Sequence, residues 1–177
     1  MRDELLGKTE NTDIDVVVLG SGVAFAKAFD EHMKQSGSLV EFPDFDTARY
    51  VFTEGEGKDK HVIQELEFAG ARSESYRETS RKPAVTPATL EQDLSRRDFT
   101  VNAMARKIQA RGLGKIVDPF DGQKDLQEKI LRTPLDPDKT FHDDPLRMLR
   151  AARFAAQLGF SIEKETLSSI ARNAERL

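Results

Sequence analysis

The stretch NTDIDVVVLGSG (residues 11–22) places two aspartates, Asp13 and Asp15, before an apolar run rich in β-branched residues. A Gly-Ser-Gly sequence follows the run. This pattern predicts a buried β-strand over residues 13–19. In an extended backbone, residues i and i+2 point the same way, so both carboxylates are expected on one face of the strand. The two ends of the strand suggest different functions.

The Gly-Ser-Gly end resembles a dinucleotide-binding turn. Gly20 and Gly22 follow a strand, open a helical pattern, and precede Glu41 by about the interval expected for a ribose-binding acid. The third position of that fingerprint is Phe25, however, where close packing of helix on strand requires Gly or Ala. The following segments also predict a hairpin rather than further βαβ units, so this function is disfavoured.

The aspartate end favours metal chemistry. Two carboxylates on one face suit hard divalent cations, which prefer oxygen ligands. A third carboxylate from a neighbouring strand would complete a two-metal site, and Glu65 and Glu67 are both candidates. An Asp-x-Asp pair alone is also typical of a solvated turn or strand start. Other motifs must therefore decide whether Asp13 and Asp15 bind metal.

Composition narrows the class of protein. The chain has 177 residues, 38% of them hydrophobic, which suits one globular domain or one domain with a helical extension. It contains no apolar run near membrane-spanning length and no signal peptide, so we expect no membrane partner. The absence of cysteine excludes thiolate chemistry and fits a reducing, cytoplasmic location.

Charge argues against one mode of nucleic-acid binding. The net charge of −4 does not suit a chain that coats nucleic acid through overall charge. Positive charge nevertheless gathers in two groups, each of which is by itself typical of a solvated face. The groups are Arg72, Arg77, Arg81, Lys82, Arg96 and Arg97, and then Arg147, Arg150 and Arg153.

Periodicity predicts a mixed sheet with a hairpin. A helix is expected over residues 23–35, closed by Gly37, with short strands over 39–42 and 48–53 and a longer strand over 61–69. The polar composition of residues 70–89 predicts a long mobile loop. Beyond it we expect a helix over 90–108, a hairpin over 109–119, and helices to Leu177.

Four stretches resemble, in order, the motifs of the class II nucleotidyltransferases, which are the bacterial tRNA CCA-adding enzymes and poly(A) polymerases. They are RDELLGKTENTDIDVVV (2–18), RRDFTVNAMA (96–105), IVDPFDGQKDL (116–126) and HDDPLRMLRAARFAAQLGF (142–160). The resemblance implies an α/β fold of the nucleotidyltransferase, polymerase beta-like type, a mixed sheet with flanking helices followed by a helical neck segment. It places the head at residues 1–137 and the start of the neck at 138–177.

The resemblance assigns Asp13 and Asp15 to the catalytic metal pair and favours Glu67 as the third carboxylate, with Glu65 as the fallback. Two Mg²⁺ ions would activate the RNA 3′-hydroxyl and neutralise the triphosphate while pyrophosphate leaves in line. No covalent nucleophile is required. His32, His61 and His142 are therefore expected to be structural or surface residues.

The resemblance also implies partners: CTP and ATP as substrates, and the 3′ end of tRNA or another RNA as acceptor. Asp98 and Asn102 are expected one helical turn apart, and Asp144 and Arg147 on one helical face, where they would select the base. The implied nucleotide-binding residues are Arg2, Asp3, Arg97, Asp98, Asn102, Asp144, Arg147, Arg150 and Arg153. We expect Phe99, Val101, Met104, Ala105, Leu146, Leu149, Phe154 and Leu158 in the core.

Three departures from the family pattern limit the resemblance. The paired glycines that precede Arg-Asp in the family would lie before Arg2, Asp143 replaces a glutamate, and Asp121 replaces the first of two glycines. Without glycines before Arg2, weak triphosphate binding is expected, and because the chain stops inside the expected neck, poor transfer to RNA is expected as well. Poly(A) polymerase shares every motif named here, and a non-catalytic nucleotide- or RNA-binding remnant is the alternative of another class.

Overall fold

The computed structural model describes residues 1–8, 13–55, 57–77 and 80–177. Contacts within the chain divide it into two compact units. The sheet unit comprises residues 8–73 and 85–92, and the helical unit comprises residues 1–7, 74–84 and 93–177. This division does not follow the boundary expected at residue 137, and that boundary remains a prediction.

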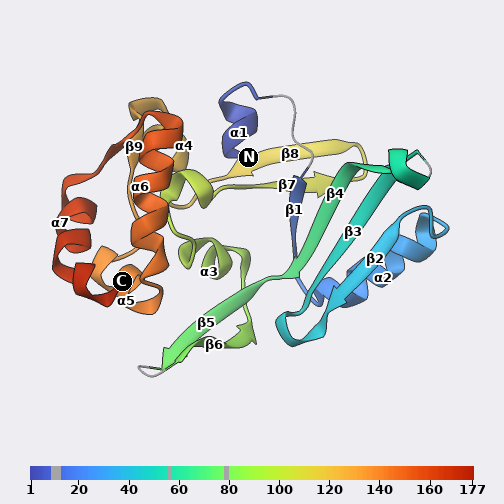
Figure 1. Ribbon diagram of the computed structural model, residues 1–177, viewed down its shortest axis with the longest axis horizontal. Helices are drawn as coiled ribbons and strands as arrows, with labels where there is room; N and C mark the ends of the chain where they lie inside the picture. The colour runs from blue at the N-terminus through green and yellow to red at the C-terminus, as the bar shows by residue number, and fades with distance from the viewer. Residues whose placement is uncertain (9–12, 56, 78–79) are drawn as a thin grey trace. The chain divides into compact units, whose positions relative to one another are not determined.

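The sheet unit is built on a four-stranded mixed sheet with the order β1-β4-β3-β2 (Figure 1). Its strands are β1 (Asp13–Val18), β2 (Ser38–Phe42), β3 (Thr47–Glu54) and β4 (His61–Gly70). β1 pairs with β4 in parallel, and the other two pairings are antiparallel. The mixed sheet and its hairpin are thus confirmed, and the pairing differs from the all-parallel order of a dinucleotide-binding fold.

Helix α2 (Gly22–His32) covers one face of this sheet. Ala26 of the helix is buried with Ala48, Tyr50 and Phe68 of the strands. The Phe29 ring lies 5.2 Å from the Tyr50 ring, centroid to centroid, in an edge-on arrangement that aromatic pairs favour. Since side chains alternate along a strand, the acidic residues at the intervening positions project from the opposite face.

The helix ends earlier than expected, and Gly37 has another role. α2 stops at His32, and Lys34 and Gln35 make the turn with positive φ values of 54° and 57°. Gly37 donates its N–H to the Tyr50 hydroxyl at 2.8 Å, and a Cβ at this position would collide with the Tyr50 ring. The glycine is thus required by a close approach and does not terminate the helix.

The Gly-Ser-Gly sequence begins helix α2. Ser21 is the N-cap and accepts the Ala24 N–H at 3.2 Å. The Asp46 carboxylate accepts the Ser21 hydroxyl at 2.6 Å and the N–H groups of Gly22 and Val23 at 3.1 and 3.2 Å. Burial raises the pKa of Asp46, but these hydrogen bonds outweigh it and the pKa lies below its ordinary value. This end of the strand therefore has a capping role.

Gly22 is required by backbone packing. A Cβ at Gly22 would lie 2.5 Å from the Asp46 carbonyl oxygen and 2.7 Å from the Gly70 nitrogen. Both atoms belong to the backbone, which has little room to shift. The glycine that resembled a phosphate-binding position thus allows the start of α2 to lie against the sheet.

The prediction of a long loop over residues 70–89 is wrong. β5 (Arg72–Arg77) and β6 (Ser80–Pro87) form a two-stranded sheet. The Ser73 and Thr86 hydroxyls lie 2.8 Å apart across it. Polar composition indicates that few side chains are buried, but strand pairing depends on backbone hydrogen bonds, which composition does not report.

The helical unit is formed mainly by the segment that follows α3 (Leu90–Ser95). Its hairpin, β7 (Ala105–Gln109) and β8 (Gly112–Val117), confirms the hairpin expected there. Helices and short strands follow to the end of the chain. They are α4 (Gly122–Glu128), β9 (Ile130–Leu131), α5 (Pro137–Asp143), α6 (Leu146–Leu158), β10 (Ser161–Ile162) and α7 (Lys164–Asn173).

Short 3-10 turns complete the description, with the N-terminal helix α1 (Arg2–Leu5), which belongs to the helical unit. Two turns lie in the sheet unit, η1 (Pro43–Phe45) and η2 (Gly57–Asp59). The other two, η3 (Thr100–Asn102) and η4 (Ala174–Arg176), lie in the helical unit. No described helix is long and apolar enough to cross a membrane.

The prediction of one continuous helix over residues 90–108 is wrong. α3 ends at Ser95, and Phe99 is extended, with φ −136° and ψ 152°. The Thr100 N–H donates to the Arg132 carbonyl at 2.8 Å instead of continuing a helix. Burial of Phe99 and Val101 in the unit's core favours this break over helical periodicity, because both side chains are fully buried.

The core of the helical unit confirms most of the expected apolar residues. Phe99, Val101, Met104 and Phe154 are buried, and Leu158 packs against this core. Ala105 is only partly buried, and Leu146 and Leu149 are 44% and 55% exposed, so the expectation for these leucines is wrong. Helix α6 faces the core with Met148, Ala151 and Phe154, which leaves Leu146 and Leu149 on its outer side.

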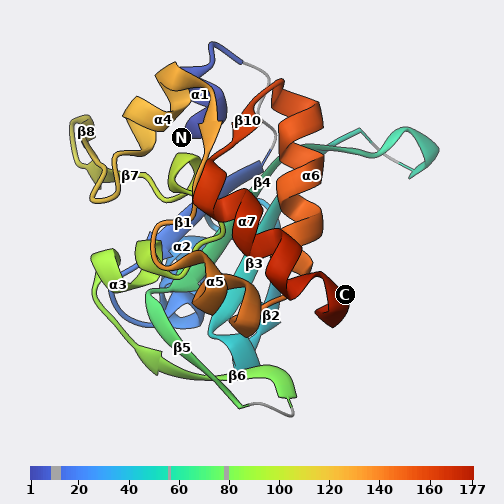
Figure 2. The same ribbon diagram turned by 90° about the vertical axis from the view of Figure 1, so that its left-hand side faces the viewer.

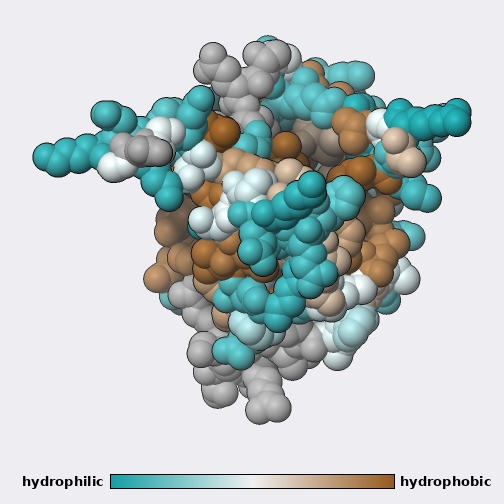
Figure 3. All heavy atoms as spheres, turned by 90° about the vertical axis from the view of Figure 1, so that its right-hand side faces the viewer, coloured by the Kyte–Doolittle hydropathy of each residue, from teal (hydrophilic) through white to brown (hydrophobic). Residues whose placement is uncertain are grey.

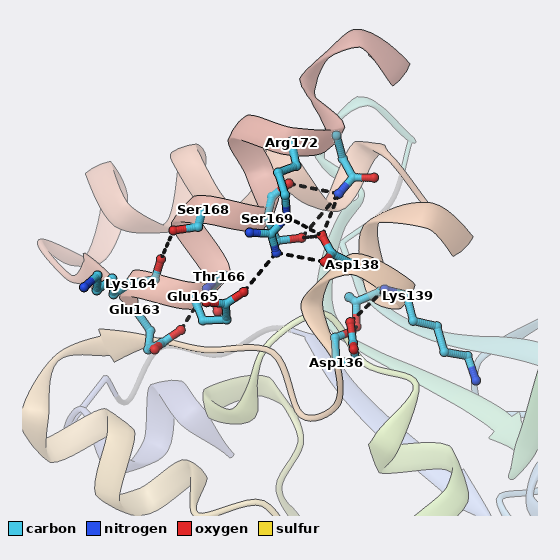
Figure 4. Close-up of polar contacts among 12 residues, drawn as sticks. Asp136, Asp138, Lys139, Glu163, Lys164, Glu165, Thr166, Ser168, Ser169 and Arg172 are labelled. Carbon is cyan, nitrogen blue, oxygen red and sulfur yellow. Dashed lines mark hydrogen bonds and ion pairs between the residues drawn. The ribbon is translucent and has the colours of Figure 1, made fainter.

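Helices α5 and α7 lie close together (Figure 2), and a polar clamp of side chains joins them (Figure 4). The Asp138 carboxylate accepts hydrogen bonds from the Ser169 hydroxyl at 2.6 Å, from Arg172 Nη2 at 2.8 Å and from Asn173 at 3.0 Å. Arg172 also binds Glu165 at 2.9 Å. The hydrogen bond from Arg172 holds the pKa of Asp138 below its ordinary value. The clamp fixes the helix that ends beside Asp144.

Strand β2 lies at an edge of the four-stranded sheet and exposes Val40 and Phe42. The surface on this side of the molecule mixes hydrophobic and hydrophilic areas (Figure 3). Val40 is paired with Arg49 of β3 in the strand register, on the face opposite α2. This face of the sheet is therefore partly apolar at β2 and charged toward β1.

Candidate active site

The carboxylates of the sheet unit lie in register on neighbouring strands. Asp13 pairs with Glu65 and Asp15 with Glu67 in the parallel β1–β4 ladder. Val16, Val18, Leu66 and Phe68 belong to the core under α2, so the four acids share the opposite face. The shared face predicted for Asp13 and Asp15 thus follows from the register, and both aspartates are exposed.

Arg49 of β3 binds the two glutamates. Its Nε lies 2.6 Å from Glu65 Oε1, and its Nη2 lies 3.5 Å from Glu67 Oε2. The β3–β4 register places Arg49 directly opposite Glu67. Glu65 therefore makes the closer ion pair, while Glu67 lies opposite both Arg49 and Asp15.

The carboxylate side chains on this face are of the chemical type that binds divalent cations. Carboxylate oxygens on strands about 4.8 Å apart suit Mg²⁺, a hard cation. Within the described ranges, however, no three His, Cys, Asp or Glu side chains stand close enough to hold a metal. Glu67, which lies opposite Asp15 in the ladder, would have to turn its side chain from Arg49 toward Asp15 to join the aspartates at a metal.

Asp98 is the centre of the polar cluster in the helical unit. It is 6% exposed, and its Oδ1 accepts the Phe99 N–H at 2.8 Å and Asn102 Nδ2 at 2.9 Å. Its Oδ2 accepts Nε and Nη2 of Arg150 at 2.8 and 2.6 Å. The pairing of Asp98 with Asn102 occurs without the helix expected between them, because η3 brings the two residues together. All four donors hold the carboxylate in one position.

Three arginines from two sequence motifs surround the Phe154 ring in the same unit. The guanidinium carbons of Arg2, Arg150 and Arg153 lie 5.0, 5.4 and 4.7 Å from the ring centroid. Arg2 also donates to Asn102 Oδ1 at 2.8 Å and to Asp3 Oδ2 at 2.7 Å. Cation–π contact with one buried ring holds these charges together. The cluster is suited to binding phosphate oxygens, which guanidinium groups bind bidentately.

The expectation that Asp144 and Arg147 lie on one helix is wrong. Asp144 is the C-cap of α5, with φ −143° and ψ 99°, and α6 begins at Leu146. Pro145 explains the break, because a residue before proline is disfavoured in the helical conformation. The pair is nevertheless brought together: Arg147 Nε lies 3.9 Å from Asp144 Oδ2, and the Arg147 N–H donates to the Asp144 carbonyl at 3.1 Å.

Asp93 is a buried acidic residue beside Arg96 and Arg97 that was not predicted from the sequence. It is 1% exposed and lies 2.7 Å from Arg96 Nη2 and 3.3 Å from Arg97 Nη2. Arg97 Nε is buried and has no hydrogen-bond partner among the described residues. The spacing of Asp93 three and four residues before two arginines is the signal that identifies it, since such pairs meet on a helical turn.

Asp121, which stands where the family pattern has a glycine, has a strained backbone conformation. Asp121 has φ 57°, in the left-handed region, and α4 begins immediately after it. Asp118 caps this helix by accepting the Gly122 and Gln123 N–H groups at 2.7 and 2.9 Å. The turn is therefore kept, with aspartate tolerated where glycine would be less strained.

The structure thus brings the predicted residues into two groups. One is the carboxylate face of the sheet unit, and the other is the arginine and aspartate cluster of the helical unit. His32, His61 and His142 are exposed, as expected. The basic residues Arg77, Arg81 and Lys82 have side chains outside the described part of the structure.

A mixed sheet with in-register carboxylates, followed by an arginine-rich helical segment, is the architecture of a nucleotidyltransferase. The chain belongs to the Poly A polymerase head domain family, whose family model matches residues 1–132. This confirms the family and the α/β fold class indicated by the sequence motifs.

Individual relatives are tRNA nucleotidyltransferases. The A-adding tRNA nucleotidyltransferase of Aquifex aeolicus is 43% identical over 167 residues, which are 94% of this chain and 18% of the relative. The tRNA nucleotidyltransferase cca2 of Schizosaccharomyces pombe is 38% identical over 181 residues, 96% of this chain and 36% of the relative. The chain therefore spans about a third or less of these two relatives.

Solved structures agree with this assignment. A CCA-adding enzyme in apo form II matches with a TM-score of 0.81 and 36% identity, over 99% of this chain and 38% of that one. A tRNA nucleotidyltransferase complexed with a primer tRNA and an incoming ATP analog matches with a TM-score of 0.74 and 37% identity. That match covers 98% of this chain and 44% of the other.

Proposed function

We propose that this chain carries the catalytic head of a template-independent RNA nucleotidyltransferase that adds CMP and AMP, from CTP and ATP, to the 3′ end of tRNA. The observation that carries the proposal is the clustering of residues from separate motifs. Arg2, Asn102, Asp98 and Arg150 form one connected polar network beside Phe154. The names of the relatives support the tRNA acceptor.

In this proposal, Asp13, Asp15 and Glu67 hold Mg²⁺ ions in the sheet unit. Bound Mg²⁺ would lower the pKa of the RNA 3′-hydroxyl and offset negative charge on the triphosphate. The hydroxyl oxygen would bond to the α-phosphorus, its proton would pass to solvent, and the bond from that phosphorus to the pyrophosphate oxygen would break. The carboxylates contribute fixed negative oxygens, and no covalent intermediate with the protein is required.

The helical unit contributes nucleotide recognition. Arg2, Arg150 and Arg153 offer guanidinium donors to phosphate oxygens, and Arg97 has a donor to spare. Asp98 and Asn102 are engaged with each other and with arginines, so we assign them to holding those donors as well as to the ribose. Asp144 and Arg147, with Asp3 supporting Arg2, complete the proposed nucleotide-binding set.

Addition of AMP alone is the second candidate, and a specific observation favours it. Two relatives, from Aquifex aeolicus and Geobacter sulfurreducens, are A-adding tRNA nucleotidyltransferases, at 43% and 38% identity. Both cover at least 94% of this chain. The reaction would be the same, with a narrower choice of nucleotide.

The products of one assay separate the candidates. The protein is incubated with Mg²⁺, labelled CTP or ATP, and two tRNA acceptors, one lacking the whole 3′ CCA and one lacking only the terminal A. We expect CMP and AMP incorporation into the first acceptor. Incorporation of a single AMP, only into the second, would identify an A-adding enzyme, and a long A tract a poly(A) polymerase. Absence of Asp15-dependent incorporation on either acceptor would contradict a catalytic head and favour a non-catalytic binding module.

A further inference from the structure

Arg49 is a charged residue on the carboxylate face that the proposed reaction does not use. It lies on β3 between Ala48 and Tyr50, both fully buried under α2, so the side chain of Arg49 projects from the opposite face. There it meets Glu65 at 2.6 Å and Glu67 at 3.5 Å. Its positive charge therefore lies among the acids proposed to bind metal.

Repulsion between neighbouring carboxylates explains what the positive charge of Arg49 does on this face. Asp13 and Asp15 lie directly beside Glu65 and Glu67 in the parallel ladder, so four negative groups share adjacent positions of two strands. Like charges directly opposite one another destabilise a strand pair. An arginine facing the two glutamates from the third strand reduces this repulsion while no metal is bound.

The two ion pairs of Arg49 differ. Glu65 is 24% exposed and in short contact with Nε, whereas Glu67 is 40% exposed and in long contact with Nη2. Asp15 lies opposite Glu67 on the other side of β4. Glu65 is thus held by its ion pair with Arg49. Glu67 is the glutamate whose side chain can turn toward Asp13 and Asp15.

We propose that Arg49 is a positioning residue that anchors Glu65, leaves Glu67 available as the third carboxylate, and acts as a built-in counter-cation that competes with divalent metal. This inference rests on the proposed function, because it assumes a metal at Asp13 and Asp15. The bound metal and Arg49 repel each other, so the arginine stabilises the metal-free sheet and weakens metal binding.

Removing the charge should therefore tighten metal binding. A unit charge and a divalent ion about 6 Å apart interact, even at the dielectric constant of water, strongly enough to change an equilibrium constant about tenfold. For Arg49→Met we expect the affinity for Mn²⁺, measured by calorimetry in the absence of nucleotide, to rise about tenfold. We also expect a lower melting temperature without metal and a larger upward shift of that temperature on adding Mn²⁺.

Two control variants isolate the effect. Lys27→Met removes the same charge from α2, where Lys27 pairs with Glu41 at 3.0 Å, and should leave Mn²⁺ affinity unchanged. Arg49→Lys keeps the charge but loses the planar fork, and its affinity should stay within about twofold of the wild type. Arg49→Lys also serves if Arg49→Met does not fold. A tenfold gain in Arg49→Lys would contradict the counter-cation role.

Glutamate variants test the division of roles. Glu67→Gln should weaken Mn²⁺ binding more than Glu65→Gln, and the melting-temperature loss of Arg49→Met should nearly disappear when Glu65→Gln is already present. Equal Mn²⁺ affinities for the wild type, Arg49→Met and Lys27→Met would overturn the inference. If Asp15→Asn still loses Mn²⁺ binding in that case, the proposed metal site stands. If Mn²⁺ binding in the wild type does not depend on Asp15, both fail.

Discussion

Arg150 and Asp98, which lie 52 residues apart in the sequence, are joined by two nitrogen atoms of the guanidinium at 2.8 and 2.6 Å. The carboxylate is buried and also accepts bonds from Phe99 and Asn102. This pair links the second sequence motif, RRDFTVNAMA, to helix α6. It fixes one side of the arginine cluster in the helical unit.

Replacing Arg150 should lower the stability of the fold, because Asp98 would remain buried without the positive charge that faces it. For Arg150→Met we expect the free energy of unfolding to fall by about 2 to 3 kcal/mol, measured by urea denaturation. Arg153→Met, on the same helix and exposed, should lose no more than about 1 kcal/mol. Equal losses for the two variants would show that the ion pair with Asp98 is not what stabilises this region.

Base selection should depend on Asp144 and Arg147. Asp144→Ala or Arg147→Ala removes one partner of the proposed hydrogen bonds to the base edge, each worth about 1 to 3 kcal/mol when left unpaired. We expect the preference for CTP and ATP over UTP and GTP to fall by roughly 5- to 100-fold in competition binding. Affinity for triphosphate itself should change less, since the arginines around Phe154 remain. An unchanged order of preference would contradict the assignment.

The clamp at Asp138 predicts a local effect on α7. Asp138→Asn should weaken the bonds from Ser169, Arg172 and Asn173, so backbone amides of α7 should exchange with solvent faster. Amides of the sheet unit should be unaffected. Glu165→Gln, which removes only the outer partner of Arg172, should have a smaller effect. Uniform acceleration across the chain would instead indicate global destabilisation.

Asp46 predicts a pH dependence of stability. Its folded pKa lies below the ordinary value of 3.8, so the folded state binds its proton less readily than the unfolded state does. The resulting stabilisation is complete above that ordinary value and is lost as the pH falls toward the folded pKa. Asp46→Asn should therefore be less stable than the wild type at neutral pH, and the difference should shrink on acidification through this range. Thermal unfolding from pH 6 to about pH 2.5 tests this, and a constant difference would contradict it.

The sequence predicted the mixed sheet better than the conformation of the backbone around the candidate site. Strand periods of two and the Asp-x-Asp spacing gave the mixed sheet and its acidic face, because alternation directly reflects burial. The helix expected through Asp98 and Asn102 failed because Phe99 and Val101 are buried by tertiary contacts that local periodicity does not contain. Pro145 could have predicted the break after Asp144, which the expectation of a single helical face overlooked, whereas the ion pairs of Arg49 depend on a strand register that only the folded sheet supplies.

The most direct test of the account is Mg²⁺-dependent incorporation of labelled nucleotide into tRNA by Asp13→Asn and Asp15→Asn, compared with the wild type. Asp44→Asn, an exposed aspartate of η1, serves as the charge-matched control. We predict that both site variants fold normally but lose activity on the order of a thousandfold, while the control keeps it. Near-normal incorporation by either Asp13→Asn or Asp15→Asn would contradict the claim that the carboxylate face of β1 and β4 is the catalytic centre.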